Sequence, residues 1–246
     1  MKKLQCLNGN TLKIFAAICM VFDHIGVFFF PFEPFWRIIG RLTFPIFAFM
    51  ISEGAKYTKN RRKYFLLIFI LSAVCQLVYY FFADSLYMCI LVTFSISILL
   101  IYALDYFKAA MFDPQSTMEK KIFAGGVFLL SGVIAYALNC VFEIDYGFIG
   151  CITPLFASIF DFSRVKVSEN LKRLDRTELR ALTMGLTLLL LAVGVGGVQY
   201  YSLLALIPLL LYSGERGRLK MKYFFYIFYP LHLVLLEAIY IFLYYI

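Results

Sequence analysis

Long apolar runs separated by short polar loops constrain this chain more than any other feature of its sequence. About 20 apolar residues cross the hydrocarbon core of a bilayer as a helix, and that length gives about nine candidate spans. They run over residues 12–30, 36–54, 63–83, 87–106, 121–140, 146–162, 178–194, 198–213 and 222–245. In lipid, each run has to satisfy its backbone hydrogen bonds internally. We therefore expect an all-α, polytopic transmembrane helix bundle of about nine helices, forming one membrane domain over residues 1–246.

The composition excludes a water-soluble globule. Of the 246 residues, 63% are hydrophobic and 15% are charged, whereas soluble domains carry about 25% charged residues. The mean hydropathy is +0.84. The net charge of +8 would suggest a nucleic-acid partner in a soluble protein. Here the positive-inside rule explains the basic residues, so we expect no nucleic acid as a partner.

The charges in the loops predict the orientation of the chain. Basic residues gather in the segments 56–63, 164–180 and 216–222. The alternate loops hold Asp84, then two acidic residues within 143–145, then the neutral segment GVGGVQ. Cytoplasmic loops carry the excess of Lys and Arg. The N-terminus is therefore predicted to be cytoplasmic and the C-terminus extracytoplasmic.

Two apolar segments need separate interpretation. The run at 12–30 resembles a signal peptide, but it lacks a small-residue cleavage site and contains Asp23 and His24. It is therefore predicted to be the first transmembrane helix. The run at 146–162 is short and contains two glycines and a proline, so we expect it to be broken or re-entrant.

Several ionisable residues lie inside the predicted spans. A charge near the bilayer centre costs at least roughly 2.5–3.5 kcal/mol, so each one needs a reason. At 1.5 Å per residue, His24 and Arg41 lie roughly 9 Å, and Glu237 roughly 12 Å, below the outer surface, with His232 nearer the midplane. His24, Arg41 and Glu237 therefore fall in one layer. The full set is Lys13, Asp23, His24, Arg37, Arg41, Glu53, His232 and Glu237.

The first two spans carry a plausible set of partners. Asp23 and His24 are about 100° apart around a helix, so each needs a partner on another helix. Arg41 is the natural partner of Asp23, with Arg37 one turn above it on the same face. Lys13 lies about three helical turns before His24, so both point the same way. A donor entering from the cytoplasm would meet both.

Two prolines interrupt helices beside these residues. Pro45 has no N–H for the carbonyl of Arg41, and Pro230 has none for the carbonyl of Tyr226, shortly before His232. Interrupted helices beside buried polar groups tend to line cavities. The interruptions therefore occur where a site is expected.

Each of these signals also has a structural interpretation. Asp23, His24 and Arg41 could simply fix the packing of the first two helices, because buried polar groups act as packing contacts in membranes. Lys13 and Glu53 could be a snorkelling interfacial pair. The basic loop residues could set topology alone, or they could hold the phosphates of a nucleotide-bearing donor. These loop candidates are Lys56, Arg61 and Arg62.

Several stretches of the sequence resemble one known family, and together they span nearly the whole chain. They are TLKIFAAICMVFDHIGVFFFP, RIIGRLTFPIFAFMISEG, YTKNRRKYFLLIFILSAVCQ, DYGFIGCITPLF and KYFFYIFYPLHLVLL. The family is TraX, whose namesake is implicated in acetylating the N-terminal amine of conjugative pilin subunits. It is also distantly similar to the multi-pass acyltransferases of the acyltransferase-3 group, which modify extracytoplasmic polysaccharides. The resemblance implies a multi-pass protein of the bacterial cytoplasmic (inner) membrane.

The matching motifs imply which residues form the site. These are Asp23 and His24 of DHIG, Arg37 and Arg41 of RIIGR, Glu53 of SEG and His232 of YPLH. Where the larger group commonly shows an arginine near the start of its first helix, this chain has Lys13.

The resulting hypothesis is an integral membrane acyltransferase that uses acetyl-CoA from the cytoplasm and no metal. The acceptor would be an amine or hydroxyl of an extracytoplasmic or membrane-embedded molecule, such as a peptide or pilin N-terminus or a glycan. His24 would act as base or as acyl carrier, oriented by Asp23 or Glu237. Arg41, with Arg37, would stabilise the oxyanion or hold the donor.

The other predicted positions are assigned to substrate binding. They are Lys13, Glu53, His232 and, for the CoA phosphates, Lys56, Arg61 and Arg62. The alternative function is a transporter or permease in which the same buried ionisable residues relay protons or ions.

Overall fold

The computed structural model describes residues 5–83, 86–219 and 221–245, and its secondary structure there is helical apart from two isolated β-bridges. Asp84 of the predicted outer loop lies outside these residues. The contacts divide the chain into two compact units. Unit 1 comprises Met1–Phe47 and Leu188–Ile246, and unit 2 comprises Ala48–Thr187. Unit 1 is thus assembled from the two ends of the sequence.

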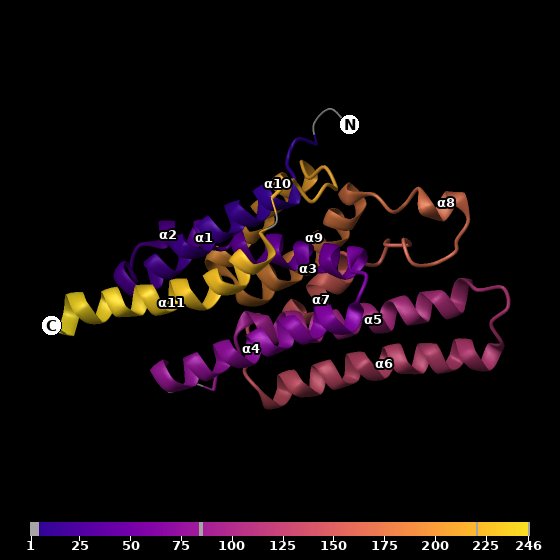
Figure 1. The fold of residues 1–246 in the computed structure, drawn as a ribbon, viewed down its shortest axis with the longest axis horizontal. Coiled ribbons are helices and arrows are strands. Elements are labelled where there is room, and N and C mark those ends of the chain that lie inside the picture. The colour runs from indigo at the N-terminus through magenta and orange to yellow at the C-terminus, as the bar shows by residue number, and fades with distance from the viewer. Residues whose placement is uncertain (1–4, 84–85, 220, 246) are drawn as a thin grey trace. The chain divides into compact units, whose positions relative to one another are not determined.

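Unit 1 is built around its first helix. Helix α1 packs against α2 and against α11, and the 3-10 helix η2 packs against α2 and α10 (Figure 1). The bounds are α1 Gly9–Phe29, α2 Pro34–Gly40, η2 Gly197–Ala205, α10 Leu206–Leu210 and α11 Lys222–Tyr245. The start of α3 (Thr43–Tyr57) and the end of α9 (Thr177–Val195) also belong to it.

Unit 2 is built around α5. This helix contacts α4, α6 and α7, and the buried core among them is aliphatic (Figure 1). The bounds are α4 Arg61–Ala83, α5 Ile90–Phe112, α6 Met118–Val141, α7 Gly147–Phe156 and α8 Glu169–Lys172. The core residues are Ala55, Leu100, Ile101, Leu104, Ala135, Ile144, Cys151 and Leu155.

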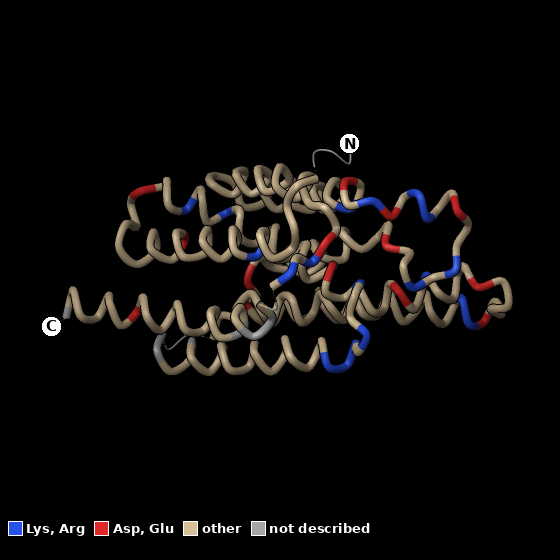
Figure 2. The backbone as a smooth tube through the Cα atoms, turned by 45° about the horizontal axis from the view of Figure 1, so that its top comes forward, with Lys and Arg blue, Asp and Glu red and all other residues tan. Residues whose placement is uncertain are grey.

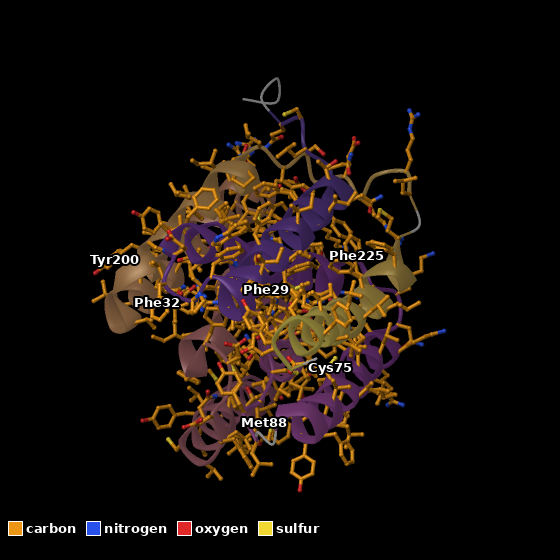
Figure 3. The ribbon with its side chains drawn as sticks, turned by 90° about the vertical axis from the view of Figure 1, so that its left-hand side faces the viewer. Phe29, Phe32, Cys75, Met88, Tyr200 and Phe225 are labelled. Atoms are coloured by element: carbon orange, nitrogen blue, oxygen red, sulfur yellow. The ribbon has the colours of Figure 1, made fainter. Side chains whose placement is uncertain are left out.

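Six helices within the described residues are long and apolar enough to cross a membrane. They are Gly9–Phe29, Pro34–Tyr57, Ile90–Phe112, Met118–Val141, Thr177–Val195 and Ile227–Tyr244. In α6, only 11% of the residues in the most apolar 18-residue stretch are buried, so the aliphatic side chains of this helix face outward. On η2, Tyr200 likewise points outward (Figure 3). Apolar surface of this extent is stable only in lipid, so the chain is a multi-pass membrane protein.

Two of the nine predicted spans are much shorter than a bilayer in the structure. The run at 146–162 forms α7, which has 10 residues; its N-cap Tyr146 and its first residue Gly147 both have positive φ. The run at 198–213 forms η2 and the five-residue α10. Gly196 and Gly197 have positive φ, a backbone conformation that ends an α-helix. Helix α9 therefore ends at Val195, and η2 begins at Gly197.

The predicted interruption of the second span is confirmed. Helix α2 ends at Gly40 and α3 begins at Thr43, so Arg41 lies at the break. Pro45 is the third residue of α3, a position at which a missing N–H costs no intrahelical hydrogen bond. The N–H of Arg41 still bonds to the carbonyl of Arg37 at 3.1 Å. The break therefore leaves both arginines on one short, well-ordered segment.

Glycines in two of the family-like motifs allow α1 and α2 to pack closely. A Cβ on Gly26 of DHIG would lie 2.5 Å from Cβ of Trp36, and one on Gly40 of RIIGR would lie 2.3 Å from Cβ of Asp23. Both distances are far below a van der Waals contact. The motif glycines thus set the approach that brings Asp23 to the arginines of α2.

Replacing Gly40 with alanine is therefore expected to separate α1 from α2. The overpacking should destabilise the protein by about 1–3 kcal/mol, measured as thermal unfolding in detergent. Gly126→Ala on α6 is the matched control, since its Cβ would meet no atom within 4 Å. Equal melting temperatures for the two variants would contradict the packing role of Gly40.

Candidate functional site

The two histidines of this chain lie in contact, although they are 208 residues apart. Nε2 of His232, on α11, lies 3.2 Å from Nδ1 of His24, on α1. The rings meet edge to face, with their centroids 4.9 Å apart. His24 is half-buried, and His232 is only 6% exposed. Together they form what we call the histidine pair.

The sequence had placed His232 deeper than His24 and without a partner. That placement assumed that both helices end at the same level. In the structure, α11 continues much farther beyond His232, to Tyr245, than α1 continues beyond His24, to Phe29. The two imidazoles are therefore level with each other.

Neighbouring carbonyl groups indicate where the protons of the pair lie. Nδ1 of His24 is 2.9 Å from the carbonyl oxygen of Met20, and Nδ1 of His232 is 3.0 Å from that of Phe228. A carbonyl oxygen only accepts, so each Nδ1 carries a proton. The single Nδ1–H of His24 is then shared between the carbonyl oxygen of Met20 and Nε2 of His232, which both accept. Nε2 of His24 is left as an unprotonated nitrogen, with no hydrogen-bond partner among the described residues.

The face of α1 next to His24 carries Asp23, whose carboxylate contacts two guanidinium groups. Arg37 Nη1 lies 2.9 Å and Arg41 Nη2 lies 3.4 Å from the carboxylate. The side chains of Asp23 and Arg41 are 18% and 12% exposed, so the pair is shielded from solvent. The predicted partnership of Asp23 and Arg41 is confirmed. His24, one residue on, faces α11 instead.

Gln199 is a member of this group that sequence reasoning missed. Its Oε1 accepts a hydrogen bond from Nη1 of Arg41 at 3.0 Å, and the residue is only 1% exposed. It lies on η2, within the neutral segment that was interpreted as a loop. The available signal was one amide among small apolar residues, and it pointed to no particular partner.

Two other predicted residues of unit 1 lie on α11 and on α1. Glu237 is half-buried on α11, and within the described part of the chain it makes no hydrogen bond or ion pair. The predicted layer of His24, Arg41 and Glu237 is therefore not formed by direct contact. Lys13 is half-buried in the second turn of α1.

Unit 2 contains a second polar group, which we call the Arg180 cluster. Arg180 is 2% exposed and forms an ion pair with Glu53 of α3. It also donates to Ser52 Oγ at 2.9 Å and to the carbonyl of Ala157 at 2.8 Å. The sequence had counted Arg180 among loop charges that set topology, although it lies inside an apolar helix, α9. The cluster consists of Ser52, Glu53, Lys56, Arg61, Asp105, Lys108, Asp161, Asp175 and Arg180.

The basic residues predicted to bind phosphate are largely neutralised in this cluster. Lys56 Nζ lies 2.6 Å from Asp175 and 3.7 Å from Asp161. Burial raises the pKa of Asp161, but Lys56 and the groups of Ser163 outweigh it and hold the pKa below its usual value. Arg61 pairs with Asp105 of α5. Only Arg62 of the three predicted residues is exposed.

Acidic and basic residues alternate along the segment that joins α7 to α9 (Figure 2). Lys108 of α5 adds hydrogen bonds to the carbonyls of Ser158 and Asp161, at 2.7 and 3.0 Å. This segment is thus fastened to α3 and α5 from several sides. The arrangement has the character of a structural anchor. Within the described residues, no three side chains of His, Cys, Asp or Glu lie close enough to hold a metal ion.

The geometry can be set beside known proteins. The family model described as TraX protein matches residues 8–240. The chain belongs to the TraX family. The match includes the histidine pair and the Asp23 ion pairs, so both lie within the TraX region. No curated protein matches the chain, and no solved structure matches it.

Proposed function

We propose that this TraX-family protein is an integral membrane acyltransferase. It transfers acetyl from acetyl-CoA to an amine or hydroxyl of an extracytoplasmic or membrane-embedded acceptor, such as a peptide or pilin N-terminus or a glycan. One observation carries the proposal: in the histidine pair, Nδ1 of His24 faces the carbonyl of Met20 and the ring of His232, and the tautomer assigned from these contacts leaves Nε2 of His24 unprotonated. An unprotonated imidazole nitrogen can accept the proton of an attacking nucleophile as a general base.

In the proposed reaction, the acceptor attacks the carbonyl carbon of the thioester. Nε2 of His24 takes the proton of the attacking amine or hydroxyl as the new C–N or C–O bond forms. The carbonyl becomes an oxyanion and then reforms as the C–S bond breaks. CoA leaves as a thiol with the proton from His24. The base is thereby restored.

His232 takes the orienting position that the sequence had assigned to Asp23 or Glu237. Its Nε2 faces Nδ1–H of His24 at 3.2 Å, so it would stabilise the imidazolium that forms when His24 is protonated. The same arrangement supports the second role left open, in which Nε2 of His24 attacks the thioester and carries the acyl group.

The ion pairs of Asp23 support an electrostatic role for Arg41 and Arg37. Two guanidinium groups share one carboxylate in a shielded environment, so the group carries net positive charge. Positive charge held in a low-dielectric site stabilises a developing oxyanion. Arg62, which is exposed at the start of α4, stays a prediction for binding of CoA phosphate.

The proposal is tested by incubating membranes that contain the protein with labelled acetyl-CoA. Label should move to an acceptor that membranes without the protein leave unlabelled. The His232→Phe variant should lose about 10- to 100-fold in kcat with little change in KM, because a hydrogen bond to a charged group is worth about 1.5–3 kcal/mol. His232→Gln, which keeps an acceptor oxygen, should recover part of the loss.

A merely structural His232 would give equal losses for both variants. If no acceptor becomes labelled and the purified protein neither binds nor hydrolyses acetyl-CoA, the acyltransferase proposal is refuted. Proton or ion movement by the protein in sealed vesicles would then support the transporter alternative, in which the buried ionisable residues form a relay.

A further inference from the structure

Two polar atoms on η2 are buried without a hydrogen-bond partner among the described residues. They are Nε2 of Gln199 and Oγ of Ser202. Gln199 is 1% exposed and Ser202 is 0% exposed. Burying a donor without an acceptor is costly, and native structures rarely leave one so. Two such atoms within one turn of a helix therefore mark a place where an oxygen ligand would satisfy both donors.

The direction of the Gln199 amide follows from its neighbour. Arg41 has only donors, so the amide atom that faces its Nη1 at 3.0 Å has to be the oxygen. The two N–H groups of Nε2 therefore point away from Arg41. They remain available to an acceptor.

The helix type places Ser202 beside Gln199. In a 3-10 helix, residues three apart eclipse each other. Gln199, Ser202 and Ala205 are all buried, so they form one stripe of η2. Runs of 3-10 helix longer than three or four residues are uncommon, and η2 has nine. Since η2 packs against α2, this stripe belongs to the same region as Arg41.

The chemistry of these groups selects the ligand. An amide N–H and a hydroxyl beside a guanidinium present donors from three side chains. Such a set binds an oxygen that carries, or develops, negative charge.

We infer that Gln199 and Ser202 form the subsite for the carbonyl oxygen of the acyl group of acetyl-CoA. This inference rests on the proposed function. As the acceptor attacks, the C=O π electrons move to that oxygen, and the two donors, with Arg41 behind Gln199, stabilise the charge. When the C–S bond breaks, the charge returns to reform the carbonyl, and CoA departs with the proton from His24.

The test compares the binding of acetyl-CoA with that of CoA, which lacks the carbonyl group. Trp36 is the chain's single tryptophan and neighbours Arg37 on α2, so its fluorescence reports binding at this region. The wild type should bind acetyl-CoA more tightly than CoA. Gln199→Leu and Ser202→Ala should each abolish that preference and lower kcat by about 10²–10³-fold.

Tyr200→Phe is the matched control, because Tyr200 lies between the two residues on η2 and is 48% exposed. It should keep both the preference and kcat. Ser202→Ala removes a single oxygen atom, so it serves as the milder variant if Gln199→Leu does not fold. Detergent-solubilised samples of all three should be monodisperse and melt like the wild type.

The outcomes separate this inference from the proposed function. If the wild type binds CoA and acetyl-CoA equally, the subsite is refuted whether or not transfer occurs. If transfer occurs and both η2 variants retain normal kcat and preference, the subsite is refuted and the acyltransferase stands. If the preference exists and the variants lose it, but no acceptor is ever labelled, the subsite stands and the transfer function is refuted.

Discussion

The His24→Ala variant is expected to be produced, inserted and folded normally, yet to transfer no detectable acetyl. Removing the base or carrier should lower kcat by at least about 10²–10⁴-fold. Folding should survive because His24 contacts a helix carbonyl and one imidazole but holds no ion pair. Label transfer from acetyl-CoA in membranes, normalised to the amount of protein, is the measurement.

Two comparisons sharpen this prediction. Cys19→Ala alters a buried side chain on the same helix and should leave transfer intact. Rapid quenching after mixing with labelled acetyl-CoA in the absence of an acceptor distinguishes the two roles of His24, since an acyl-imidazole leaves label on the protein and a general base does not. Near-normal transfer by His24→Ala would remove this residue from the mechanism.

The second large effect is expected in unit 2. Arg180→Met should cost about 3–5 kcal/mol of stability, because it leaves Glu53 buried without its ion-pair partner. The double variant Arg180→Met, Glu53→Gln removes both charges and should recover much of the loss. Thermal unfolding in detergent provides the measurement.

Arg173→Met is the control for Arg180, as it removes an exposed arginine from the segment before α9. Its effect should stay within about 0.5 kcal/mol. If Arg180→Met melts like this control, the Arg180 cluster does not anchor the segment between α7 and α9.

Much of the fold was predictable because a backbone in lipid has to form its hydrogen bonds internally, which favours helices. Apolar runs of bilayer length became helices such as α1, α5 and α6, and the glycine- and proline-containing run at 146–162 became the short α7. The break beside Arg41 was predictable for a similar reason, because Pro45 leaves no N–H for its carbonyl. These are local consequences of sequence.

Contacts between helices that are far apart in the sequence were harder to predict. Asp23 and Arg41 were matched because consecutive helices pack together and their depths could be counted from a shared loop. His232 could not be matched to His24, since hydropathy does not show which helix packs against α11, and the predicted depths assumed that α1 and α11 end at the same level. Arg180 was hidden among loop charges, because charge counting ignores burial.

The way in which unit 1 is assembled has a consequence for biogenesis. One imidazole of the histidine pair comes from α1 and the other from α11, so the pair is shared by the earliest and latest helices of the described chain. Proteins are made from the N-terminus onward. Under the proposed function, nascent chains that stop short of α11 should therefore transfer acetyl much more slowly, and full activity should appear only when α11 has docked.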